Sequence, residues 1–176
     1  MKKQQRIYLF SALTVALGIL VDLLTKALAV ERLKGQDSAV LIRGWLRFTY
    51  LENDGAAFGS LSEHRWVFMV LSSIGILALC VYLVFVKHNG YLLPISLSLI
   101  ISGGIGNMID RVRLGYVVDF IDFYRFDFWR YIFNVADALV CVGAALTVLA
   151  VIFEWRAESR KKEEENVNDD LQNHSK

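Results

Sequence analysis

Two aspartates stand in surroundings that suit acid–base chemistry. Asp119 lies among large apolar residues in the stretch VVDF, and Asp137 lies in FNVAD, where a long apolar run begins. Two carboxylates within hydrogen-bond reach cannot both ionise readily, so one keeps a proton while the other can deprotonate a water molecule. The pair therefore predicts the chemistry of an aspartic protease, which hydrolyses an amide without a metal or a covalent intermediate.

A structural role for the second aspartate is equally consistent with the residue types. Asn134 could be the N-cap of the helix that follows, and Asp137 would then favour the positive end of the helix dipole. Both roles can hold together. A helix N-terminus favours the charged form of Asp137, so we hypothesise that Asp119 carries the shared proton at rest, although such a pair titrates jointly.

Other polar residues interrupt the apolar stretches toward one end. Asp22 and Lys26 are four residues apart and share a helix face. A charge at membrane depth costs about 2.5 to 3.5 kcal/mol on insertion scales, so such residues face the interior of a helix bundle and commonly have a function. An internal ion pair and direct contact with a substrate are equally supported. Asn107 and Arg111 share another face, and Arg111 could instead extend toward lipid headgroups.

The elements that must position these residues are membrane helices. The chain has 176 residues, 55% of them hydrophobic, and a single proline, which indicates one membrane domain. A spanning helix needs about 20 apolar residues. We expect an all-α membrane protein whose domain, residues 1–155, has four transmembrane helices at about 7–30, 66–86, 91–109 and 135–153.

The segment between the first two helices has a different character. Residues 45–52 are aromatic and β-favouring, and the turn signal Asn53-Asp54-Gly55 follows them. We expect a small extracytoplasmic β-rich segment here, with a short hairpin on the membrane surface.

Charge and loop length predict the orientation. The short connection 87–90 makes the second and third helices antiparallel, so four spans put both termini on the side of that connection. Basic residues gather on this side, which predicts that it is cytoplasmic; they are Lys2, Lys3, Arg6, Lys87, Arg156, Arg160, Lys161 and Lys162. Residues 156–176 are charged and almost free of apolar side chains, so we expect a disordered cytoplasmic tail.

Several classes of function are disfavoured. Cys80 and Cys141 lie in separate apolar runs and the three histidines are isolated, which argues against a zinc site or a disulfide framework. We therefore expect no metal and no cofactor. A net charge of +1 gives no indication of a nucleic-acid partner.

Five motifs, in this order, resemble those of the lipoprotein signal peptidases, also called signal peptidase II. They are DLLTK at 22–26, ENDGAAFG at 52–59, GGIGNMIDR at 103–111, VVDF at 117–120 and FNVAD at 133–137. The resemblance runs over nearly all of residues 7–153 and implies that Asp119 and Asp137 are the catalytic dyad. It further implies that six residues line or support the site: Asp22, Lys26, Asn53, Asn107, Arg111 and Asn134.

The same resemblance implies an intramembrane aspartic endopeptidase of the bacterial cytoplasmic membrane. Such enzymes need no metal or organic cofactor and are blocked by the cyclic peptide globomycin. The substrate would be a prolipoprotein whose cysteine already carries a diacylglyceryl group, with cleavage just before that cysteine. We expect a monomer among membrane lipids, with Phe48, Tyr50 and Phe58 of the outer segment closing over the substrate.

Two other functions compete with this one. A transporter or proton channel also uses acids at membrane depth, but it predicts inverted repeats or helices broken at mid-membrane, whereas the acids here cluster toward one surface. A non-catalytic assembly protein would use Asp22 and Lys26 as an interhelical pair. In that protein, Asp119→Asn would leave function intact.

Overall fold

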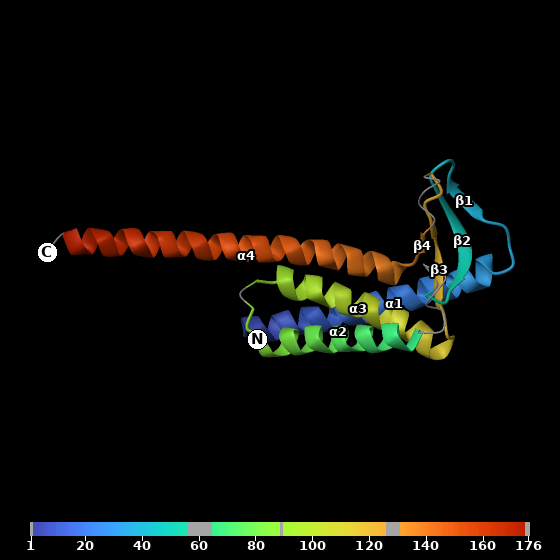
Figure 1. The fold of residues 1–176 in the computed structure, drawn as a ribbon, viewed down its shortest axis with the longest axis horizontal. Coiled ribbons are helices and arrows are strands. Elements are labelled where there is room, and N and C mark those ends of the chain that lie inside the picture. The colour runs from blue at the N-terminus through green and yellow to red at the C-terminus, as the bar shows by residue number, and fades with distance from the viewer. Residues whose placement is uncertain (1, 56–64, 89, 126–130, 175–176) are drawn as a thin grey trace.

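The architecture is a bundle of four helices with a small sheet at one end (Figure 1). The computed structural model describes residues 2–55, 65–88, 90–125 and 131–174. The elements in chain order are α1 (Lys3–Leu33), β1 (Ala39–Ile42), β2 (Leu46–Asn53), α2 (Arg65–Phe85), α3 (Leu92–Arg113), β3 (Val117–Asp122), β4 (Ile132–Phe133) and α4 (Val135–His174).

The described helices include three that are long and apolar enough to cross a membrane. They are α1, α3 and the part of α4 from Val135 to Glu164. In α2 the described apolar stretch is shorter, Met69–Phe85. Large apolar side chains face outward on the bundle, as expected for contact with lipid rather than water; Leu77 and Phe85 are 64% and 80% exposed. The chain is therefore a membrane protein.

The third helix, α3, packs closely against its neighbours because small residues line its buried faces. A side chain on Gly103 would meet the backbone carbonyl of Ala136 in α4, and one on Gly106 would meet the carboxylate of Asp22 in α1. Small residues of this kind let helix backbones approach in lipid. They bring α1, α3 and α4 together at the end of the bundle next to the sheet, where the polar residues lie.

The sheet differs from the expected β-rich segment because both outer segments contribute to it. The strand order is β1-β2-β3-β4, and all neighbouring strands are antiparallel. Strands β1 and β2 lie between α1 and α2 in the chain, whereas β3 and β4 lie between α3 and α4. The expected β-rich segment between the first two helices is present as β1 and β2, and the sheet extends beyond it through β3 and β4. Val118 and Phe120 of β3 pack with Ala29 of α1. Burial of this apolar cluster stabilises β3, a strand that was not expected from the sequence.

The hairpin turn also lies elsewhere than expected. Strands β1 and β2 are joined at Gly44, which has a positive φ of 79° that glycine adopts without strain. The Asn53-Asp54-Gly55 signal follows β2 instead, where the Asn53 side chain accepts a hydrogen bond of 2.9 Å from the Gly55 backbone N–H. This turn fixes the end of β2 beside β3.

The charged segment after Trp155, expected to be disordered, continues α4 as helix to His174. Glutamate, lysine and arginine favour helix, and Glu158 and Lys162 form an ion pair one turn apart, 3.3 Å between their charged atoms. Figure 1 shows this end of α4 extending alone beyond the bundle. Helix propensity and pairs within the helix, rather than a packed apolar face, account for its conformation.

Candidate active site

Asp119 is a buried carboxylate at the junction of the sheet and the bundle, with an exposed fraction of 1%. It lies in β3, and each of its oxygens accepts a hydrogen bond from an amide side chain. Asn53 Nδ2, at the end of β2, lies 2.7 Å from Oδ2, and Asn134 Nδ2, just before α4, lies 2.6 Å from Oδ1. The pairing of Asn53 with Val117 in the sheet brings the first of these amides into reach.

Asp137 lies in the first turn of α4 and makes reciprocal capping hydrogen bonds with Asn134. The Asp137 backbone N–H donates to Asn134 Oδ1 at 2.9 Å, and the Asn134 N–H donates to Asp137 Oδ2 at 3.2 Å. The capping interpretation is therefore confirmed for both residues. Capping leaves Asp137 Oδ1 available, and this oxygen accepts a hydrogen bond of 2.7 Å from Asn107 Nδ2.

Two amide side chains connect the aspartates. Asn134 Nδ2, which donates to Asp119, also lies 3.1 Å from the side-chain oxygen of Asn107, whose own nitrogen donates to Asp137. Asn134 is fully buried, so its position is fixed by the packing of β3, α3 and α4 around it. The structure thus brings Asp119 and Asp137, from different outer elements, into one hydrogen-bonded site.

Burial sets the ionisation of Asp119. Loss of hydration raises the pKa of Asp119 to about 6; the hydrogen bond from Asn53 opposes this rise, and the nearby charge of Asp137 adds to it. The pair consequently retains a proton to a much higher pH than an exposed aspartate would. Such a pair can donate a proton and accept one at the same time.

A buried charge cluster supports the dyad from within the bundle. The ammonium of Lys26, 3% exposed, lies 2.9 Å from Asp22 Oδ2 and 3.1 Å from Asp110 Oδ2. It also donates to Asn107 Oδ1 at 2.9 Å. Because the Asn107 oxygen is held by Lys26, its amide nitrogen must face Asp137. Lys26 therefore orients Asn107, which donates a hydrogen bond to Asp137.

The ion pair of Asp22 and Lys26 joins three helices. Asp22 Oδ1 accepts a hydrogen bond of 2.9 Å from the Ala136 backbone N–H in the first turn of α4. Lys26 contacts α3 through Asn107 and Asp110. Of the two interpretations left open by the sequence, these contacts support the internal ion pair.

Asp110 is a member of the cluster that sequence analysis did not single out. It is 5% exposed, pairs with Lys26, and accepts a hydrogen bond of 3.1 Å from the Val118 backbone N–H. It thereby fixes the start of β3 next to Asp119. The signal was present in the sequence, since Asp110 follows Asn107 by three residues and shares its helix face.

Arg111, Phe48 and Tyr50 make no direct hydrogen bond to the carboxylates of Asp119 and Asp137 in the described part of the chain. The Arg111 guanidinium is partly buried and donates a long hydrogen bond of 3.4 Å to the Asn107 carbonyl, without an ion pair to either aspartate among the described residues. Phe48 packs its ring against Phe120, with centroids 6.1 Å apart, and Tyr50 donates to Glu52. Phe58, expected to help close the site, lies outside the described residues.

The described part of the chain holds no group of three or more histidine, cysteine, aspartate or glutamate side chains that could bind a metal ion. The side-chain donors that contact Asp119 and Asp137 are asparagine amide nitrogens, which suit carboxylates rather than cations.

Comparison with known proteins assigns the family. The profile described as signal peptidase (SPase) II matches residues 14–153. The chain belongs to the signal peptidase II family. It is therefore a protease of a bacterial membrane, and the site just described lies within the matched residues.

Relatives of the family agree over most of their length. A lipoprotein signal peptidase of Clostridium tetani is 44% identical over 148 residues, which cover 84% of this chain and 95% of that protein. One of Halothermothrix orenii is 39% identical, with coverages of 83% and 95%. A bacterial membrane enzyme solved by the in meso method at 1.9 Å is 33% identical, covers 80% of this chain and 91% of its own, and has a TM-score of 0.74.

Proposed function

We propose that this protein is an intramembrane aspartic endopeptidase that removes signal peptides from diacylglyceryl-modified prolipoproteins, cutting just before the lipidated cysteine. The observation that carries the proposal is the connection of Asp119 to Asp137 through Asn134 and Asn107 in a partly buried site. Membership of the signal peptidase II family and relatives named lipoprotein signal peptidase support the substrate class.

The two aspartates have different roles in the proposed reaction. Asp137, in the first turn of α4, removes a proton from water, and the oxygen attacks the scissile carbonyl carbon. Asp119 donates its proton to the carbonyl oxygen. When the carbon–nitrogen bond breaks, Asp137 delivers the proton taken from water to the leaving nitrogen, and the re-formed carbonyl returns the other proton to Asp119.

The location of the site suits a lipid-anchored peptide. The two aspartates belong to β3 and to the first turn of α4, which meet where the helix ends join the sheet (Figure 1). In the proposed orientation this junction lies at the depth where a bilayer changes from hydrocarbon to headgroups. An acyl anchor on one side and an apolar signal helix on the other would hold a peptide bond at this depth. Arg111 and Asn107 are suited to contact the substrate's backbone or glyceryl ester groups. We further propose action as a monomer without a cofactor and inhibition by globomycin.

The proposed topology has four spans, with α2 as the second. The helices alternate in direction, and both chain ends lie away from the sheet (Figure 1). The basic residues near both ends favour a cytoplasmic location for the termini and an extracytoplasmic site. Alkaline phosphatase fused after Lys162 should be inactive, and the same reporter inserted after Asp37 should be active. The opposite pattern would reverse the orientation.

Cleavage of a diacylglyceryl-modified prolipoprotein tests the chemistry. Purified Asp119→Asn and Asp137→Asn should each lose at least about 10³-fold in rate, because each removes one proton-transfer group. Asp37→Asn, an exposed aspartate on the same side of the bundle, is the matched control and should cleave like the wild type. Undiminished cleavage by either dyad variant would remove that aspartate from the reaction.

A further inference from the structure

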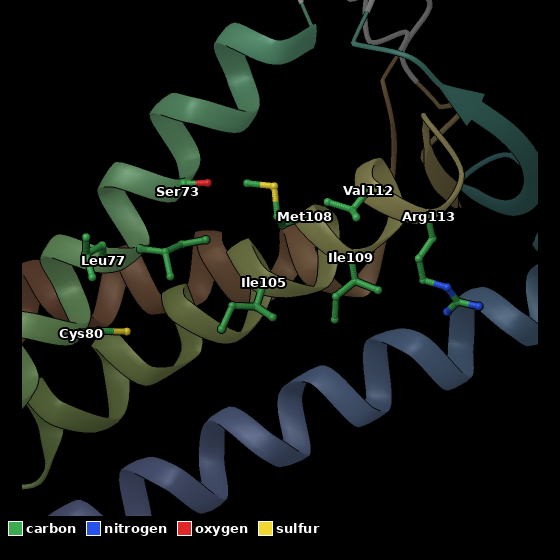
Figure 2. A pocket seen from close by; sticks show the side chains of 9 residues that line it. Ser73, Leu77, Cys80, Ile105, Met108, Ile109, Val112 and Arg113 are labelled. Atoms are coloured by element: carbon green, nitrogen blue, oxygen red, sulfur yellow. The ribbon is translucent and has the colours of Figure 1, made fainter.

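A groove of about 530 Å³ lies between α2 and α3, on the lipid-facing side of the bundle (Figure 2). Apart from one hydroxyl, one thiol and one guanidinium, its lining is apolar. The residues are Ser73, Ile76, Leu77, Cys80, Ile105, Met108, Ile109, Val112 and Arg113. Leu77 and Val112 are 64% and 67% exposed, so the groove opens toward the bilayer rather than into the protein.

The groove arises because α2 diverges from α3 toward the sheet. The two helices are close at Gly104, where an added Cβ would lie 3.0 Å from Ile76. Beyond that point α2 leans away, and Met108 and Ile109 of α3 have no helix backbone directly over them (Figure 2). A wedge of this shape widens toward the end of α3. Its apolar lining suits a hydrocarbon chain.

This groove is separate from the candidate active site. Successive residues of an α-helix are rotated by about 100°, so Ile105 and Ile109, each two residues from Asn107, lie roughly opposite it on α3. Asn107 faces Asp137, whereas the two isoleucines line the groove. An occupant of the groove is therefore separated from the dyad by the body of α3.

A cation stands at the wide end of the groove. Arg113 is the last residue of α3, is exposed, and makes no ion pair within the described part of the chain. Trp66, 60% exposed in the first turn of α2, lies at the same end of the bundle, at the depth where tryptophan sits among headgroups. A guanidinium at this depth matches the oxygens of a phosphate group.

We infer that this groove and Arg113 form a binding site for an anionic membrane phospholipid, with an acyl chain in the groove and the phosphate on Arg113. The charge selects this occupant over the diacylglyceryl group of a lipoprotein, which has no phosphate to pair with the guanidinium. The site needs neither aspartate and stands independently of the proposed peptidase reaction.

Native mass spectrometry of the full-length protein, released from detergent with added lipid, tests the inference. Wild type should retain phosphatidylglycerol in preference to phosphatidylcholine and to diacylglycerol. Arg113→Gln should reduce retention of phosphatidylglycerol by about fivefold, the effect of one basic residue near an anionic membrane surface. Val112→Trp, which places a large ring in the groove, should reduce retention of all three lipids.

Arg43→Gln is the matched control, because Arg43 is an exposed arginine near the same end of the bundle but on the sheet. It should leave phosphatidylglycerol retention unchanged. Equal retention by wild type and Arg113→Gln, or an equal loss in Arg43→Gln, would overturn the inference. Preferred retention of diacylglycerol would do the same and would assign the groove to the substrate. Thermal unfolding of each variant establishes that it is folded.

Discussion

At the residue scale, Asn134 connects the two aspartates directly, because its side chain hydrogen-bonds to both Asp119 and the backbone of Asp137. Its side-chain oxygen caps α4 at the Asp137 N–H, and this fixes the direction of its nitrogen toward Asp119 and Asn107. An amide has one accepting and one donating end, so an aspartate or leucine here could not satisfy both sides. The same side chain therefore both caps α4 and positions Asp119 relative to Asp137.

The ionisation of Asp119 predicts the pH dependence of cleavage. Since the pKa of Asp119 is about 6, the pair loses its one remaining proton as pH rises through about 6, and kcat/KM should fall above it. Asn53 lowers this pKa by donating to the charged form. Asn53→Ala should therefore move the fall to higher pH.

The measurement is the pH profile of kcat/KM rather than the rate at one pH, because Asn53→Ala also removes a positioning contact. Asp37→Asn, remote from the dyad, should keep the wild-type profile. A shift of the Asn53→Ala profile to lower pH, or none, would contradict the role assigned to the hydrogen bond.

Much of the site at this scale could be predicted from the sequence. Asp119 and Asp137 stand in motifs whose order is specific, and Asp22 with Lys26 has helical spacing. The direction of each amide could not be predicted, because it depends on partners from other elements: Asn107 is oriented by Lys26 of α1, and Asn134 by its own cap.

At the element scale, the glycines of α3 determine how closely the helices bring the polar residues together. The sequence shows that these residues are small, but it does not give the partner of each. Gly103 meets α4 and Gly106 meets α1. Likewise, β3 could not be predicted from a six-residue stretch, since it is stabilised by pairing with β2 and by packing on α1.

Adding one methyl group tests this packing. Gly103→Ala should destabilise the protein by about 1 to 3 kcal/mol and slow cleavage, because the new Cβ would displace the first turn of α4 that carries Asp137. Gly75→Ala in α2 meets no atom within 4 Å and should be neutral or stabilising by up to about 1 kcal/mol. Thermal unfolding in detergent and cleavage assays compare the two; equal behaviour would show that contact at Gly103 does not set the helix spacing.

At the scale of the whole molecule, the buried acidic residues and Lys26 lie at the end of the bundle that carries the sheet. The helices provide a lipid-facing surface, and the sheet, whose strand β3 contains Asp119, lies next to the helix ends (Figure 1). The apolar stretches made the helical class predictable. The helical conformation of residues 156–176 was not predictable in the same way. A low apolar content indicates that a segment has no packed core, and this holds both for a disordered segment and for a helix stabilised by its own side-chain pairs.

Because the candidate active site lies at the sheet end of the bundle, we expect the far end of α4 to be dispensable for cleavage. Glu154, Glu158 and Lys161 still line a cavity with His88 of the α2–α3 connection, so the chain should be cut after Lys162, beyond those contacts. Figure 1 shows this part of α4 beyond the bundle, so its removal should change stability little, and cleavage should stay within about twofold of the full-length rate. A chain ending at Phe153, which also loses the cavity residues, should unfold at a lower temperature. If truncation after Lys162 abolished cleavage in a folded protein, the extended helix would have a role in substrate capture that its isolation from the bundle does not suggest.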